Sequence, residues 1–121
     1  MNAGETIAAY CAAWNEPDLD KRRALLADSI TEDAVYIDPT VEVVGIEALM
    51  RHISRVGEMY PGSHLALRTG VDRHHDVARF GWRRVLADAT TRPESVDFVE
   101  FATDGRLSRI LGFFGPLLDT W

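Results

Sequence analysis

The segment SVDFVEFATDGRLSRILGFF, residues 95–114, carries the pattern that decides the fold. Side chains in residues 95–102 alternate between two faces, as they do in a β-strand. One of these faces carries Asp97, Val99 and Phe101. The pair Asp104-Gly105 is a strong hairpin signal, and it leads into Leu107 to Phe114, which is apolar on both faces. The segment therefore predicts two long antiparallel strands joined by a tight turn.

Two earlier stretches, residues 64–73 and residues 77–87, show the same strand-like period. Their apolar faces carry Leu65, Leu67 and Val71 in the first stretch and Ala78, Phe80, Trp82 and Leu86 in the second. Residues 77–87 also carry Val77 and Val85 on the second face, and Leu107 to Phe114 is apolar on both faces. Strands that are apolar on both faces predict a sheet that covers helices on one side. On its other side such a sheet encloses a pocket or meets a partner subunit.

The first half of the chain has a helical period instead. A stripe at i, i+3, i+4 and i+7 consists of Ile7, Tyr10, Cys11 and Trp14. This helix ends near Asn15-Glu16-Pro17, Asp18 is a plausible N-cap for a second helix, and Gly45 opens a third that ends around Tyr60-Pro61-Gly62. We therefore expect one α+β domain over residues 1–121, with three helices packed on a curved, mostly antiparallel sheet.

Composition excludes several classes of function. The 121 residues carry 13 basic and 19 acidic side chains, a net charge of −6, whereas nucleic-acid binders need a basic footprint. No segment approaches the roughly 18 consecutive apolar residues of a membrane span, and no signal-peptide pattern is visible. The single cysteine, Cys11, cannot form an internal disulfide, so we expect a cytoplasmic protein that binds neither nucleic acid nor membrane.

Asp38 is the first candidate for chemistry, in the short strand-like segment Ala34 to Pro39. Tyr36 and Asp38 share one face of this strand, and the other face is apolar. A carboxylate in such a partly dry place is expected to have a raised pKa and to serve as a general base. The alternative is that Asp38 only starts a turn with Pro39, as aspartate often does.

Asp97 is the second candidate, because it projects from the apolar face that it shares with Val99 and Phe101. A buried, unpaired carboxyl tends to stay protonated, and a protonated carboxyl can donate a hydrogen bond to a developing oxyanion. The alternative is a structural ion pair with an arginine, for which the sequence offers Arg68, Arg79 and Arg109. Tyr10, on the apolar stripe of the first helix, is either core filler or a hydroxyl donor.

The histidines do not predict a metal site. His74 and His75 are adjacent, so in a strand they would point to opposite faces, and a hairpin turn is their expected place. No further ligands stand at zinc spacing. His52 and His64 are expected to be isolated and exposed, and Cys11 is expected to be a small core residue.

Tyr10, Asp38 and Asp97 together give the chain a resemblance to the ketosteroid isomerase branch of the NTF2-like proteins, which includes the SnoaL-like polyketide cyclases. Residues 10–15 resemble that family's first-helix motif, Asp38-Pro39 its Asp-Pro pair, and residues 96–107 its late hairpin. The resemblance implies a cone-shaped fold around a pocket, with Asp38 moving the proton and Tyr10 and Asp97 donating to the oxyanion.

What the resemblance implies is a cofactor-independent isomerase or cyclase that removes a proton next to a carbonyl. Any arginine in the pocket, with Arg68, Arg79 and Arg109 as the candidates, would favour a polar or acidic ligand over a steroid. A second enzyme hypothesis is epoxide hydrolysis, which needs Asp38, Asp97 and one arginine to converge. The non-enzyme hypothesis is a ligand-binding or dimer-scaffold module.

A homodimer through the sheet is also expected. The strands that are apolar on both faces and the terminal segment Gly115 to Leu118 leave apolar surface that a small chain does not cover by itself.

Overall fold

The computed structural model describes all 121 residues, which form three helices and seven strands. In chain order the elements are α1 (Ala3–Asn15), α2 (Leu19–Ser29), β1 (Ile30–Asp38), β2 (Val41–Val44), α3 (Ile46–Met59), β3 (His64–Leu67), β4 (Asp72–His74), β5 (Val77–Val85), β6 (Ser95–Phe101) and β7 (Leu107–Phe113). The expected α+β class with three helices on a curved sheet is confirmed.

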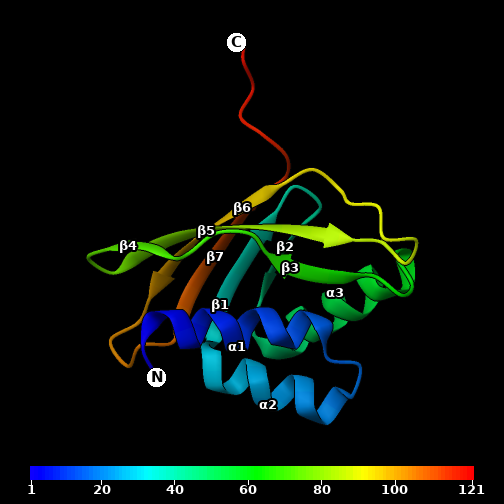
Figure 1. Cartoon of the computed structure of the whole chain (residues 1–121). Coiled ribbons are helices and arrows are strands. Elements are labelled where there is room, and N and C mark those ends of the chain that lie inside the picture. Colours follow the sequence, from blue (N-terminus) through cyan, green and yellow to red (C-terminus); the bar gives the residue numbers. More distant parts are fainter.

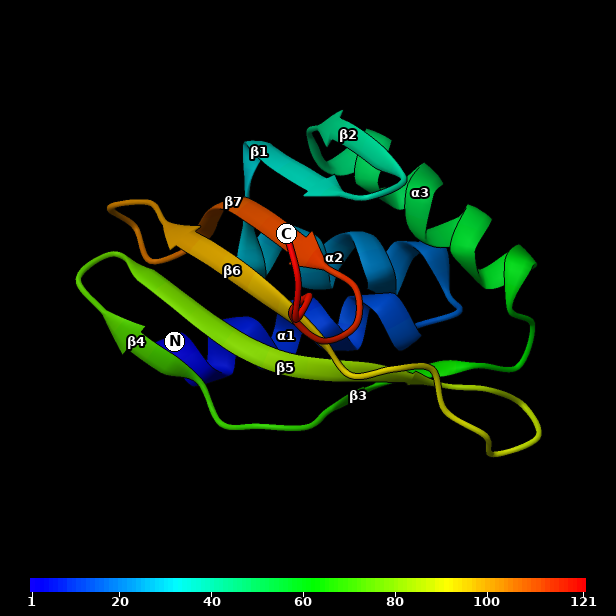
Figure 2. The same cartoon turned by 90° about the horizontal axis from the view of Figure 1, so that it is seen from above.

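The strands form one sheet in the order β2-β1-β7-β6-β5-β3. The short strand β4 also pairs with β5, at the beginning of β5, whereas β3 pairs with its end. Every pairing is antiparallel except that of β1 with β7, which is parallel. Figure 1 shows the sheet curving over α1 and α2, and Figure 2 shows the strands lying across these helices when seen from above. One face of the sheet therefore packs on helices while the other faces outward.

The helices begin where the sequence supplies a cap. Asn2 and Glu5 form a capping box at α1, and the Asp18 side chain accepts a hydrogen bond from the Lys21 backbone N–H at 3.0 Å. Gly45 precedes α3 with φ of +91°, a backbone conformation that side chains with a Cβ rarely adopt. The starts of α2 at Asp18 and of α3 at Gly45 are where the sequence pattern predicts them.

The core lies between the helices and the concave face of the sheet. Ile7 of α1, Leu26 of α2 and Leu49 of α3 are almost fully buried there, as are Leu107 and Ile110 of β7. The hairpin between β6 and β7 turns at Gly105, with φ of +87°, where Asp104-Gly105 predicts it.

Residues 64–73 do not form the single strand that the period predicts. β3 stops at Leu67, because the Thr69 hydroxyl, not a backbone carbonyl, accepts the hydrogen bond of the Gly81 N–H, at 2.7 Å. The chain pairs with β5 again only in β4. The short strand β2 is an addition that the sequence pattern does not predict.

No helix of the structure is both long enough and apolar enough to cross a bilayer.

Candidate functional site

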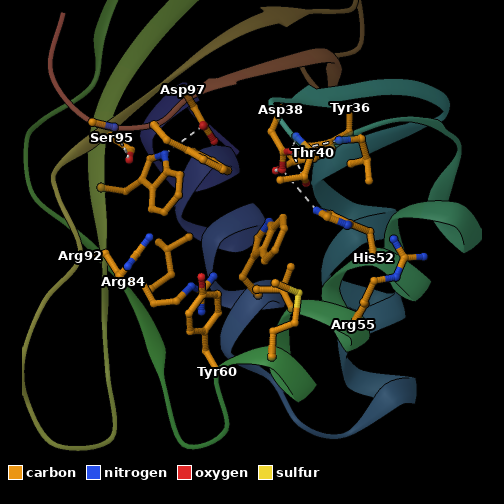
Figure 3. Close-up of a pocket in the computed structure, with 18 of the residues that line it drawn as sticks. Tyr36, Asp38, Thr40, His52, Arg55, Tyr60, Arg84, Arg92, Ser95 and Asp97 are labelled. Atoms are coloured by element: carbon orange, nitrogen blue, oxygen red, sulfur yellow. Dashed lines mark hydrogen bonds and ion pairs between the residues drawn. The ribbon is translucent and has the colours of Figure 1, made fainter.

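A cavity of about 450 Å³ lies against the concave face of the sheet, and Tyr10, Asp38 and Asp97 all line it. Figure 3 shows Asp38 and Asp97 reaching into the same end of this cavity from opposite sides. Asp38 comes from the end of β1 and Asp97 from β6, and Tyr10 comes from α1. The structure thus brings the three residues together, on the side of the sheet that packs on the helices and not on the opposite side, where the sequence pattern placed a pocket.

Asp38 accepts five hydrogen bonds. Its Oδ1 receives the Thr40 backbone N–H at 2.7 Å, the Thr40 hydroxyl at 2.6 Å and the Val41 N–H at 3.2 Å. Its Oδ2 receives the Tyr36 hydroxyl at 2.6 Å and lies 3.2 Å from His52 Nε2. Tyr36 reaches it because residues i and i+2 of a strand share a face. Both oxygens of this carboxylate are therefore occupied by protein donors.

The expectation that Asp38 has a raised pKa is wrong. Burial does raise it, but the hydrogen bonds from His52, Thr40 and Tyr36 outweigh burial and hold the pKa of Asp38 well below its usual range. Asp38 is thus a stable anion. It also begins a tight turn, since Thr40 and Val41 cap it, so the turn interpretation and the pocket interpretation both hold.

His52 is not the exposed, isolated histidine that the sequence led us to expect. It lies on α3 with only 3% of its surface exposed, packed edge-on against Trp14 and against the ring of Tyr36. Its contact with Asp38 joins α3 to the end of β1. Only the amphipathic period of α3, which places His52 beside Ile53 on the inner face, was a signal for this in the sequence.

Asp97 has a very different environment. It is 5% exposed, and its one hydrogen bond comes from the indole N–H of Trp82 on β5, at 2.9 Å to Oδ1. Burial raises the pKa of Asp97 to about 7, and the negative charge of Asp38 adds to this effect. The expectation of a carboxyl that holds its proton agrees with this environment.

The alternative interpretation of Asp97, an ion pair with an arginine, is wrong. Arg79 pairs with Asp72 at 2.8 Å and Arg68 lies 3.9 Å from Glu94, both near the surface. Arg109 is exposed on β7. These arginines fall outside the cavity because they lie on outward-facing strand positions or, for Arg68, in the break after β3.

Tyr10 is 1% exposed and lines the cavity from the inner face of α1. Burial and the neighbouring charge of Asp97 raise the pKa of Tyr10 well above its usual value. Its hydroxyl is therefore protonated and able to donate.

Gly112 separates the two carboxylates, and sequence reasoning missed it. It lies on β7, opposite Asp97 in register, and β7 is the strand between β1 and β6. A Cβ at this position would lie 3.1 Å from Asp97 Oδ1 and 3.4 Å from the Asp38 Cβ. The absence of a side chain lets the two acids approach across one strand.

The other end of the cavity is basic, and no sequence pattern points to the two arginines that line it. Figure 3 shows Arg84 and Arg92 near Tyr60, away from the two aspartates. The two guanidinium carbons lie 5.8 and 5.9 Å from the centre of the Tyr60 ring. Positive charge therefore does line the cavity, but from other arginines than those expected.

The remaining candidates lie apart from the cavity. Cys11 is buried in the core, and burial raises the pKa of its thiol. His74 ends β4 and His75 occupies the following turn with φ of +50°, as the hairpin interpretation predicts, and His64 is exposed. Among the residues of the chain, no cluster of three or more His, Cys, Asp or Glu side chains is arranged to hold a metal ion.

Comparison with known proteins gives consistent results. The model of the SnoaL-like domain family matches residues 7–110. A crystal structure of a candidate isomerase of the SnoaL-like family from Agrobacterium tumefaciens strain C58 is 32% identical, with a TM-score of 0.87 over 96% of this chain and 100% of that one. Among curated proteins, none shows significant sequence similarity.

Two more distant structures share the fold. One is a candidate SnoaL-like polyketide cyclase from Jannaschia, at 18% identity and a TM-score of 0.71, covering 92% of this chain and 83% of that one. The other, from Catenulispora acidiphila, has a ketosteroid isomerase-like fold and is in complex with trimethylamine. It is 15% identical with a TM-score of 0.73, over 92% of this chain and 85% of that one.

Proposed function

The chain belongs to the SnoaL-like family, and we propose that it is an enzyme that moves a proton next to a carbonyl group of a small molecule, as an isomerase or a cyclase does. The observation that carries the proposal is the pair of buried aspartates on one cavity. Asp38 is held ionised, whereas the pKa of Asp97 is about 7. A group with a pKa near the working pH is best suited to accept and return a proton.

The hydrogen bonds favour Asp97 as the group that carries the proton. Oδ1 of Asp97 is held by Trp82, and no protein group binds Oδ2. In the ionised form Oδ2 accepts the proton from the carbon next to the carbonyl, the C–H electron pair moves into the enolate, and the carbonyl oxygen becomes an oxyanion. The protonated Tyr10 hydroxyl donates to that oxyanion. No cofactor takes part in these steps.

Asp38 has a supporting role in this scheme. Its two oxygens already accept five hydrogen bonds, which makes it a weak base. Its fixed charge contributes to the raised pKa of Asp97 across Gly112. The family resemblance implies the reverse assignment, with Asp38 as the base and protonated Asp97 as a donor to the oxyanion.

The experiment is solvent exchange. The protein is incubated in D₂O with a panel of small ketones and oxo acids, and deuterium incorporation next to the carbonyl is followed by NMR. We expect exchange that Asp97→Asn slows roughly 10³-fold and that Tyr10→Phe also reduces. Absence of exchange with every compound of a broad panel would favour the non-enzyme hypothesis.

The pH profile separates the two assignments. If Asp97 is the base, kcat/KM rises with pH through about 7, because only the ionised form reacts. If Asp97 is the protonated donor, kcat/KM falls through the same pH. We expect the rise.

Two other hypotheses are less well supported. Epoxide hydrolysis by an Asp-Arg-Asp set requires an arginine at the carboxylates, yet no arginine lies within 4.0 Å of Asp38 or Asp97. A purely structural role predicts that Tyr10 and Asp97 bond each other or an arginine and that no cavity lies beside them. Asp97 bonds Trp82 instead, next to open space.

We also propose a homodimer through the outward face of the sheet. Phe98 of β6 and Phe113 of β7 pack edge to face there and are 40% and 60% exposed. A second copy would bury this apolar surface. Sedimentation at micromolar concentration is expected to show a dimer that Phe113→Asp disrupts, and a monomer for the unmodified chain would contradict it.

A further inference from the structure

Arg84 is a buried cation without an anion. It lies on β5 with 8% of its surface exposed, and it lines the cavity. No carboxylate lies within 4.0 Å of its guanidinium nitrogens. Burial lowers the pKa of Arg84, but an arginine remains charged in proteins. An uncompensated buried charge is costly, so its partner is expected to come from outside the chain.

The guanidinium group has unused donors. An arginine carries five N–H donors, and the one side-chain hydrogen bond of Arg84 runs from Nη1 to Ser63 Oγ, at 3.1 Å. The Tyr60 ring covers part of the charge. The remaining donors form the flat fork that matches a carboxylate or another oxyanion.

A second cation stands next to the first. The Arg92 backbone N–H donates to the Arg84 carbonyl at 2.9 Å, which holds the two residues side by side. Arg92 is exposed, forms no ion pair, and also lies over Tyr60. Together the two arginines place one buried and one exposed positive charge at the end of the cavity that lies away from the aspartates (Figure 3).

We propose that the substrate is an organic acid whose carboxylate binds Arg84, with Arg92 at the rim, while its reacting carbonyl lies at the Asp97 end. The carbonyl half of this statement rests on the proposed function, but the carboxylate half does not. A cavity of about 450 Å³ is within the range of small-molecule sites. The two ends select in opposite ways, because Asp38 repels an anion and Arg84 attracts one.

The test uses three probes of similar size that need no turnover: 4-phenylbutanoate, the neutral 4-phenylbutanamide and 2-phenylethyl phosphate. Binding to the unmodified protein is measured by isothermal titration calorimetry. We expect the carboxylate to bind roughly tenfold or more tightly than the amide, as a buried charge-assisted hydrogen bond implies. Equal affinities would overturn the proposal, and a phosphate that binds tenfold more tightly than the carboxylate would overturn the choice of a carboxylic acid.

Arg84→Met is the decisive variant, and Arg79→Met is its matched control on the same strand, since Arg79 is exposed and paired with Asp72. We expect Arg84→Met to remove the preference for the acid over the amide and the control to keep it. A preference that survives in a folded Arg84→Met protein contradicts the proposal. Because Arg92 is exposed, Arg92→Met gives a second reading that does not depend on a core change, and a several-fold smaller preference is expected.

The two proposals fail separately. If the protein prefers the carboxylate but catalyses no solvent exchange in any oxo acid, only the proton-transfer function is contradicted. Exchange in neutral ketones without any preference for an acid contradicts the inference about Arg84 alone.

Discussion

Asp38 and Asp97 are the same residue type at similar burial, 7% and 5% exposed, on either side of one strand, yet their pKa values move in opposite directions. Asp38 ends a strand, where the turn that follows supplies two backbone N–H groups and the Thr40 hydroxyl. Asp97 lies within a strand, where the backbone donors are already used in the sheet. The difference teaches that the number of available donors, more than burial, decides the charge of a carboxyl in this cavity.

The largest effect that this comparison predicts is on activity. Asp97→Asn removes the group that carries the proton while leaving an oxygen for the Trp82 indole, so exchange is expected to fall roughly 10³-fold, within the range for general bases. Glu100→Gln, on the outward face of the same strand, is the control. A fall of less than about tenfold in a folded protein would return the base role to Asp38.

The next effect is on the pH dependence of stability. Folded protein keeps the Asp97 proton up to about pH 7, whereas the unfolded chain loses it near 3.8, so the free energy of unfolding falls as pH rises between these values. The penalty above pH 7 is at most about 4 kcal/mol. Asp97→Asn should therefore be more stable than the parent at pH 8 and about equal at pH 4, as measured by urea unfolding. A constant difference across this range would contradict the raised pKa.

Asp38→Asn is expected to destabilise the protein by about 3 kcal/mol at pH 7, because an amide cannot accept all five hydrogen bonds. The lowered pKa of Asp38 gives stability that is present above about pH 3.8 and is lost as pH falls below it, so the loss should shrink in acid. Asp33→Asn, at an exposed position of the same strand, serves as the reference. Removing the Asp38 charge should also move the midpoint of the activity profile to lower pH.

The smallest effect concerns the strand between the acids. A methyl group in Gly112→Ala would contact Asp97 Oδ1 and the Asp38 Cβ, and it should cost about 1–2 kcal/mol of stability while separating the carboxyls. The pH midpoint of the kcat/KM profile, which reports the ionisation of Asp97, should then shift detectably. Gly57→Ala, where nothing lies within 4 Å, is the control and should be neutral or slightly stabilising. An unchanged midpoint in Gly112→Ala would show that the two acids do not interact across β7.

Sequence patterns predicted the elements better than the site. Helix starts at Asp18 and Gly45 and the hairpin at Gly105 follow from local chemistry, and the alternation in β6 predicts that Asp97 faces inward. The state of Asp38 was mispredicted, because its donors include His52 from α3, a contact between elements that no local pattern describes.

The basic end of the cavity was missed for a related reason. Arg84 and Arg92 lie in and after β5, and only the path of the chain around the β5–β6 connection brings both to Tyr60 at the end of α3. Strand alternation identifies which residues share a face, but it does not tell where along the sheet a cavity opens. Gly112 likewise matters only because its neighbours in the sheet are Asp97 and Asp38.

The parallel pairing of β1 with β7 has a consequence for the order of events during synthesis. Asp38 is made early and Asp97 much later, yet the strand that spaces them is made last. Until β7 inserts between β1 and β6, the nascent chain has two aspartates with no fixed separation. Such a non-local contact forms slowly, because the long loop must close first. The ability to bind a ligand should therefore appear only with the final cooperative step, which makes ligand binding a reporter of complete folding.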